Sequence, residues 1–416
     1  MASEEDILFV PSSLPATAPA SAPPEEEDIV FQPSSKTLGG DAHIYETLKQ
    51  QGFTTGMVDA LLKNKKSFPL RIWVVDNSGS MRVADGQRIA ESSTNSSVTL
   101  EKCTRWAEIV ETVQYHARMS GLMEAATIFR LLNHPGADVG PQQFSIANGD
   151  GDENGDDMTI DQEVDRAIRI MKGASPDEYT PLNHHVREII NHVRGMEGEL
   201  RKNGQKVAII IATDGVPSDG NKTSFVQYLK ELGSLPIWLV FRLCTNEDQV
   251  VDFYGDLDKL LEKPVDVLDD FVSEAKEVYK VNRWINYSLS LHRMRELGFK
   301  HRLFDLIDER LLTKDEIYEY CTFIYGEEKM SKAPYPTSDW EGFLSYMGVV
   351  TEGGEAKSWS PASKTVQPLV CVDTLRKVFG GNFNSGYGTG PYPRPTHPTS
   401  GYNGPPPAQD GCCIIT

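Results

Sequence analysis

Three oxygen-bearing side chains stand at alternate positions directly after an apolar run. The run, Ile72 to Val75, is rich in β-branched and aromatic residues, which is typical of a strand buried on both faces. Asp76, Ser78 and Ser80 follow it, and Gly79 gives the backbone conformational freedom between the serines. One carboxylate and two hydroxyls are hard oxygen ligands of the kind that Mg²⁺ prefers. The stretch therefore predicts a cation site at the carboxyl end of a buried strand.

This pattern, Asp-x-Ser-x-Ser after an apolar strand, resembles the first motif of the metal-ion-dependent adhesion site in von Willebrand factor type A (VWA) domains. Two further pieces follow in the family's order: Thr180 opens Thr-Pro-Leu, and Asp214 follows the apolar run 207–213 in Ala-Thr-Asp-Gly. The resemblance covers roughly residues 70 to 270, about half of the chain. Many family members have glycine two residues before the threonine, where this chain has Glu178. The resemblance implies one Mg²⁺ or Mn²⁺ ion, held directly or through water by Asp76, Ser78, Ser80, Thr180 and Asp214.

Strand and helix signals alternate around these residues. Further apolar runs predict strands at 126–132, 143–147, 236–243 and 265–268. Apolar residues at helical spacing predict helices from about residue 106, after Thr180, at 225–232 and at 247–262. The alternation predicts an α/β fold with a doubly wound, mostly parallel, Rossmann-like sheet. Ligands of such sheets lie at the carboxyl ends of the strands, where Asp76 and Asp214 stand.

Segments of different composition flank the predicted VWA domain, which we place at 68–270. Residues 82–99 within it read as an exposed loop. Val278, Val281, Ile285 and Leu289 recur at spacings of three and four and predict a helix. We expect the helices at both ends to pack on the VWA domain. The flanking segments are a disordered acidic tail (1–40), a helical hairpin (41–67), a helical extension (271–330), a mixed segment (331–380) and a Gly/Pro-rich tether (381–416).

The N-terminal tail contains a repeat. Glu4-Glu-Asp-Ile-Leu-Phe-Val-Pro-Ser-Ser13 recurs as Glu26-Glu-Asp-Ile-Val-Phe-Gln-Pro-Ser-Ser35. Apolar residues after acids suit a peptide that adds a strand to a sheet edge, and the pattern resembles SUMO-interacting motifs. The alternative is a duplicated tail segment with no dedicated partner. The repeat, with the Gly-Phe turn of the hairpin, supports an adaptor in ubiquitin or SUMO pathways as a second hypothesis.

The acidic run Asp150 to Asp156 matches the first half of an EF-hand calcium loop, Asp-x-Asp-x-Asn-Gly. The second half does not match, because Asp157 stands where an apolar anchor is needed and Asp161 replaces the bidentate Glu. A strand rather than a helix precedes the run. We therefore interpret it as an acidic surface insertion.

The overall charge argues against nucleic acid as a partner. The chain has 41 basic and 60 acidic residues, a net charge of −19, whereas phosphate binding needs a basic face. No run has the length of a transmembrane helix, and the acidic N-terminus does not resemble a signal peptide. Cysteines 103, 244, 321 and 371 show no metal-binding or disulfide spacing. These features predict a cytoplasmic protein.

The last residues suggest a lipid anchor. Cys413-Ile-Ile-Thr416 fits the Cys-aliphatic-aliphatic-X pattern for prenylation, and a flexible tether precedes it. Against it, threonine is uncommon as the final residue and no polybasic stretch lies upstream. A single lipid binds weakly, so a second one on the adjacent Cys412 would complete the anchor. Modification would place the protein on the cytosolic face of a membrane, and the alternative is an unmodified apolar tail.

The leading functional hypothesis is a binding or scaffold protein, not an enzyme, whose cation accepts an Asp or Glu carboxylate from a partner protein. A metal-dependent hydrolase is the remaining alternative. It would need a base near the cation, and Glu178, His184 and His185 are the candidates. The sequence contains no nucleophile elbow, phosphate loop or zinc pattern.

Overall fold

The computed structural model describes residues 41–91, 98–149, 158–261, 263, 265–353 and 357–379. A six-stranded sheet lies at its centre, with β5 antiparallel at one edge and all other pairs parallel. Its strands are β1 (Leu70–Val75), β4 (Thr127–Leu131), β5 (Gln143–Ile146), β6 (Val207–Thr213), β7 (Ile237–Leu243) and β8 (Asp266–Leu268). Their order across the sheet is β5-β4-β1-β6-β7-β8.

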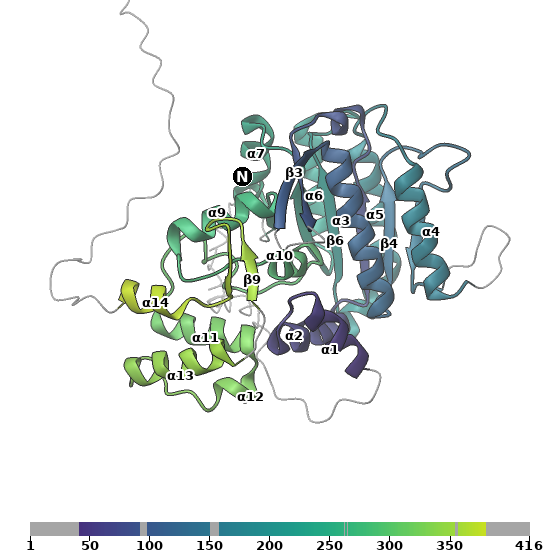
Figure 1. Ribbon diagram of the computed structural model, residues 1–416. Coiled ribbons are helices and arrows are strands. Elements are labelled where there is room, and N and C mark those ends of the chain that lie inside the picture. Colours follow the sequence, from purple (N-terminus) through teal and green to yellow (C-terminus); the bar gives the residue numbers. More distant parts are fainter. Residues whose placement is uncertain are drawn as a thin grey trace, which may run out of the picture.

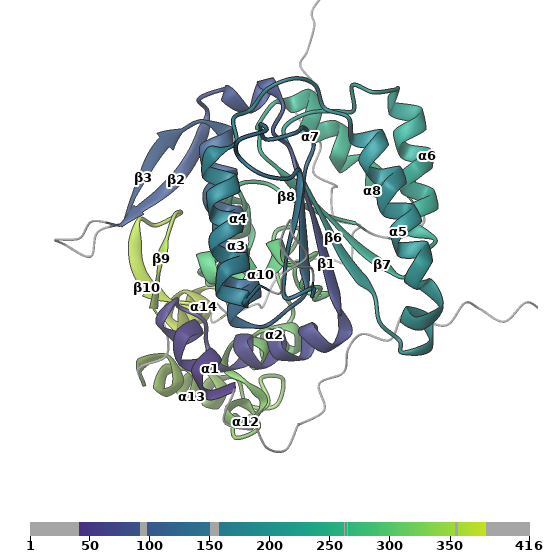
Figure 2. The same ribbon diagram turned by 90° about the vertical axis from the view of Figure 1, so that its right-hand side faces the viewer.

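Helices cover both faces of this sheet (Figure 2). One face packs against α3 (Arg105–Leu122) and α4 (Ile160–Gly173), and Trp73 of β1 lies in that core. The other face packs against four helices, and Val74 lies in that core. These four are α5 (Leu182–Lys202), α6 (Lys222–Gly233), α7 (Asp248–Gly255) and α8 (Leu257–Leu260). The predicted α/β class and the mostly parallel sheet are confirmed.

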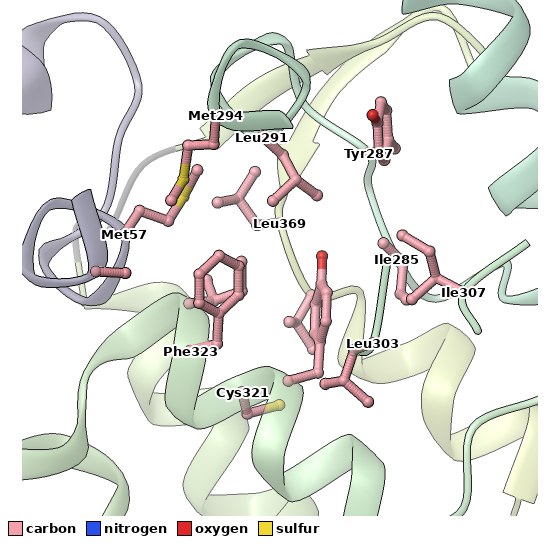
Figure 3. Close-up of a cluster of buried hydrophobic side chains, with 14 of the residues drawn as sticks. Met57, Ile285, Tyr287, Leu291, Met294, Leu303, Ile307, Cys321, Phe323 and Leu369 are labelled. Atoms are coloured by element: carbon pink, nitrogen blue, oxygen red, sulfur yellow. The ribbon is translucent and has the colours of Figure 1, made fainter. Parts of the chain in front are cut away.

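A third apolar core, separate from the two on the faces of the sheet, joins the two ends of the described chain. It brings Met57, Leu291 and Phe323 together from segments far apart in the sequence (Figures 1 and 3). Its helices are α1 (Asp41–Gln50), α2 (Thr55–Ser67), α9 (Phe271–Val281), α10 (Leu289–Glu296), α11 (Lys314–Tyr325), α12 (Glu327–Met330), α13 (Trp340–Glu352) and α14 (Val372–Phe379). The hairpin of β9 (Lys357–Ser360) and β10 (Thr365–Pro368) lies beside it.

Three local expectations were wrong. The segment 82–99 is not simply a loop, because a 3₁₀ turn (Gly79–Arg82) leads into an antiparallel hairpin of β2 (Gly86–Glu91) and β3 (Val98–Cys103). The helix predicted through Leu289 stops at Val281, and Ile285 forms a β-bridge with Val370. The hairpin α1–α2 packs mainly on α11 rather than on the sheet, because the C-terminal helices have a core of their own that includes it. No helix in the described part of the chain is long and apolar enough to cross a membrane.

A buried polar cluster ties the sheet layer to α10. The Glu296 carboxylate, 1% exposed, accepts hydrogen bonds from Arg293 (2.8 Å), His116 of α3 (3.0 Å) and Arg242 of β7 (3.1 Å). Burial would raise the pKa of Glu296, but Arg293, His292 and His116 outweigh burial and hold it well below its usual value. Burial lowers the pKa of His116 to about 4, so a neutral ring donates through Nε2.

Candidate metal centre

The two aspartates of the predicted site meet at the carboxyl edge of the sheet. β1 and β6 are parallel neighbours, and Val75 pairs with Ala212. Asp76 follows β1 directly, and its N–H donates to the Ala212 carbonyl at 2.9 Å. Asp214 follows β6 directly. Both carboxylates are buried, at 0% and 3% exposure for their residues. The register of two strands therefore brings together residues that lie far apart in the sequence.

The two serines lie beside these carboxylates. The Ser80 hydroxyl donates to Asp214 Oδ1 at 2.8 Å, and the Ser78 and Ser80 hydroxyl oxygens are 3.1 Å apart. The Ser78 N–H donates to Asp76 Oδ1 at 2.8 Å, and the Thr213 hydroxyl donates to Asp76 Oδ2 at 2.6 Å. Ser80 lies in the 3₁₀ turn and is exposed, so the cluster opens to solvent on this side.

Thr180 is brought to the same edge by its loop. Its N–H donates to Ser218 Oγ and its carbonyl accepts from the Ser218 N–H, each at 2.9 Å, which ties it to the loop after β6. The Thr180 hydroxyl lies against Gly215, where an added Cβ would be 3.9 Å from Oγ1. Asn133 supports the loop from the other side by donating to the Tyr179 carbonyl at 2.8 Å. Thr180 is thereby held beside Gly215, the residue that follows Asp214.

Two asparagines that the sequence did not single out hold the motif loops together. Asn77 Nδ2 donates to the Asn133 carbonyl at 3.0 Å, and the Asn133 N–H donates to Asn77 Oδ1 at 2.7 Å. Asn133 Nδ2 also reaches the Asp177 carbonyl at 3.0 Å. Asn77 lies inside the Asp-x-Ser-x-Ser pattern at a position that the pattern leaves open. The Asn77 side-chain amide thus pairs with the backbone N–H and carbonyl of Asn133, as a neighbouring backbone segment would. The two residues lie far apart in the sequence, so only the folded structure shows this contact.

Glu178, which stands where many VWA domains have glycine, adopts a backbone conformation typical of glycine. Its φ is 62°, in the left-handed region that glycine adopts freely and that costs other residues about 1–2 kcal/mol. Its carbonyl accepts from the Gly79 N–H at 3.3 Å, and its side chain is exposed. The loop therefore keeps a conformation that suits glycine while carrying a glutamate.

Arg105 is the other residue that the sequence did not indicate. Its Nη1 donates to Asp214 Oδ2 at 2.9 Å, and its Nη2 contacts Asp85 at 2.7 Å and Glu247 at 2.9 Å. One guanidinium thus faces three carboxylates. Burial and the neighbouring Asp214 carboxylate raise the pKa of Asp76 to about 6. The cluster thus contains four carboxylates, those of Asp76, Asp85, Asp214 and Glu247, together with the guanidinium of Arg105. The negative charge exceeds the positive charge, and a bound cation would balance the difference.

The donor set fits a small, hard divalent cation. Mg²⁺ binds through one or two carboxylates and keeps several waters, and here two carboxylates lie beside hydroxyls. Within the described residues, no group of three or more His, Cys, Asp or Glu side chains is placed to hold a metal. The candidate site differs from such groups because it combines two carboxylates with three hydroxyls. Asp76, Ser78, Ser80, Thr180 and Asp214 would hold the ion.

No protein-family model matches the chain, and a search of curated proteins found no match either. We therefore infer the site from its own residues. Within them, the Ser80–Asp214 hydrogen bond links the first motif to the third, and the Ser218 contacts link the second to the third. All three motifs thus converge on one edge of the sheet.

The remaining sequence candidates have different environments. His185 is buried, and its Nε2 lies 2.9 Å from the Leu132 carbonyl, which gives this ring a structural contact. Burial lowers the pKa of His185. His184 is exposed, with Nε2 3.5 Å from Glu188 one helical turn away. The acidic run 150–156, the tail repeat and the two C-terminal cysteines lie outside the described residues.

Proposed function

We propose that the protein is a VWA-like binding protein that holds Mg²⁺ or Mn²⁺ and uses it to recognise a carboxylate of a partner protein. The observation that carries the proposal is the convergence of the three motifs, above all the 2.8 Å hydrogen bond from Ser80 to Asp214. A cation there would lie at the carboxyl edge of a parallel sheet, where such folds bind ligands.

The surroundings of the cluster suit contact with another protein. Ser80 is exposed, so a coordination position on that side would be open to a ligand. Tyr179, next to Thr180, is 78% exposed, and it is an aromatic residue of the kind enriched at protein interfaces. An Asp or Glu of the partner would complete the coordination, while Tyr179 would contact the surface around it.

The proposal predicts that partner capture depends on the cation and on Asp76. Tagged full-length protein incubated with extract from its own cells should retain a set of proteins in Mg²⁺ and lose that set in EDTA. Asp76→Ala should lose the same set even in Mg²⁺, because it removes a ligand of the ion. Asp138→Ala is the matched control, since Asp138 is an exposed carboxylate in the connection after β4. Identical capture by all three proteins in both buffers would contradict the proposal.

We also propose that Cys413 is prenylated, so that the site is presented at the cytosolic face of a membrane. Cys413 to Thr416 fit the four-residue pattern and follow a segment rich in glycine and proline. Intact mass spectrometry of protein purified from its own cells should show a prenyl adduct and loss of Ile414 to Thr416. An unmodified C-terminus that retains these residues would refute this part of the proposal, and it would leave the cation-binding part unaffected.

A further inference from the structure

A groove lies at the end of the sheet opposite the candidate metal centre. It encloses a cavity of about 160 Å³ beside the start of β7. Its apolar wall includes Leu229, Ile237, Trp238 and Leu239. The Lys206 N–H donates to the carbonyl of Ser67, the last residue of α2, at 3.0 Å. The groove thus adjoins the helical hairpin that follows the N-terminal tail.

The backbone at the groove is an open sheet edge. The edge strand β8 pairs only with Val240 to Arg242 of β7. Residues 237–239 pair with β6 on one side and have no strand partner on the other side among the described residues, although the Ile237 N–H already donates to the Leu235 carbonyl at 2.9 Å. An unpaired edge beside an apolar cavity is a template for an added strand. The geometry therefore suits an extended peptide with apolar side chains.

The groove is also basic, in a strongly acidic chain. Four lysines line it, Lys206, Lys230, Lys263 and Lys300, although the net charge of the chain is −19. Lys300 Nζ lies 4.7 Å from the centre of the Trp238 ring. Trp238 is 6% exposed, and its indole N–H has no hydrogen-bond partner within the described part of the chain. The exposed Lys230 and Lys263 therefore offer positive charge, and Trp238 offers a buried donor, to an acidic ligand.

We propose that the first acidic and apolar segment of the N-terminal tail, Glu4 to Val10, docks in this groove of its own chain. Its apolar residues, Ile-Leu-Phe-Val, pair along the open edge of β7 and cover the apolar wall. Its three acids lie near the lysines. The second copy has one apolar residue fewer, because Gln32 replaces the last one, so the first copy is the better ligand.

The tail is long enough to make this contact. About 30 residues separate Val10 from Asp41, where α1 begins, and a chain of that length spans up to about 100 Å when extended. Tethering raises the effective concentration of the segment, so a weak contact suffices to fill the groove. Docking covers the part of β7 that would otherwise be open to other chains. It leaves the metal centre accessible, because that site lies at the carboxyl ends of the strands.

Hydrogen exchange of the full-length chain tests the proposal. The backbone amide of Leu239 faces the open edge and should be protected in the unaltered protein, whereas the Ile237 amide already has the Leu235 carbonyl as its acceptor. The Leu239 amide should exchange at least about tenfold faster in Ile7→Asp/Phe9→Asp, which cannot cover the apolar wall. The matched control is Ile29→Asp/Phe31→Asp, which alters the second copy and should leave the protection unchanged. Equal exchange in all three proteins would overturn the proposal, and so would loss of protection only in the control.

A labelled peptide of residues 4–13 tests the charge component. It should bind the full-length Ile7→Asp/Phe9→Asp chain, whose own segment cannot compete, and should bind the unaltered chain at least about tenfold more weakly. Adding Lys230→Glu/Lys263→Glu should weaken binding about tenfold, whereas Lys172→Glu/Lys202→Glu, a matched pair of exposed lysines elsewhere, should not. Equal weakening by both pairs would show non-specific attraction and overturn the proposal. So would a change from dimer to monomer in Ile7→Asp/Phe9→Asp, since the docked tail would then belong to a second copy.

Discussion

Glu296→Gln is expected to lower the free energy of unfolding by about 3–5 kcal/mol, the usual cost of breaking a buried ion pair from one side. The carboxylate accepts hydrogen bonds from Arg242, Arg293 and His116. A glutamine has a similar shape but no charge, so the buried Arg242 and the partly buried Arg293 would each lose a counter-ion. Urea unfolding at neutral pH, followed by circular dichroism, measures the change.

The control for this variant is an ion pair on the surface. Glu197 of α5 contacts Arg201 at 2.8 Å, and both side chains are partly exposed. Glu197→Gln should change the free energy of unfolding by less than about 1 kcal/mol, because water screens such pairs. A similar effect of the two substitutions would show that the Glu296 cluster does not hold α10 against the sheet layer.

Asp76→Asn is expected to weaken Mg²⁺ or Mn²⁺ binding by about 100-fold or more. Loss of an outer-shell partner alone costs about 10–100-fold in metal affinity, and Asp76 is proposed to act closer to the ion. Without metal the fold should persist, because asparagine retains Oδ1 as acceptor for the Ser78 N–H. Removing the charge also relieves the repulsion with Asp214 that contributes to the raised pKa of Asp76.

A thermal shift assay separates these two effects. A cation at a hundredfold excess over its Kd stabilises the folded state by about 2.7 kcal/mol, so the melting temperature of the unaltered protein should rise. Asp76→Asn should show the same melting temperature in EDTA within a few degrees and no rise with Mg²⁺ or Mn²⁺. Asp138→Asn, which removes an exposed carboxylate, should behave like the unaltered protein. An equal rise in Asp76→Asn would remove Asp76 from the set of ligands.

The central sheet could be predicted because its strands carry strong local signals. The run 207–213 is buried along its whole length, as a continuous apolar run indicates, and the structure assigns β6 to the same residues. The position of Asp76 beside Asp214 follows from the same reasoning, since both come directly after strands that are parallel neighbours.

The features that could not be predicted depend on contacts between distant residues. Arg105 begins an ordinary amphipathic helix, and nothing in its local sequence indicates that it faces Asp214. The third core is assembled from both ends of the described chain, so no single stretch of the sequence indicates it. β2 and β3 carry many polar residues, and their pairing became visible only through the backbone register.

The location of a bound ion tests the central claim most directly. Crystals of the full-length protein grown or soaked with MnCl₂ and measured at the manganese absorption edge would show the ion as an anomalous peak. We expect a peak among Asp76, Ser78, Ser80, Thr180 and Asp214, and we expect this peak to be lost in crystals of Asp76→Asn. A manganese peak only at another site, or none at these residues in crystals whose lattice leaves this edge of the sheet open to solvent, would contradict the central claim.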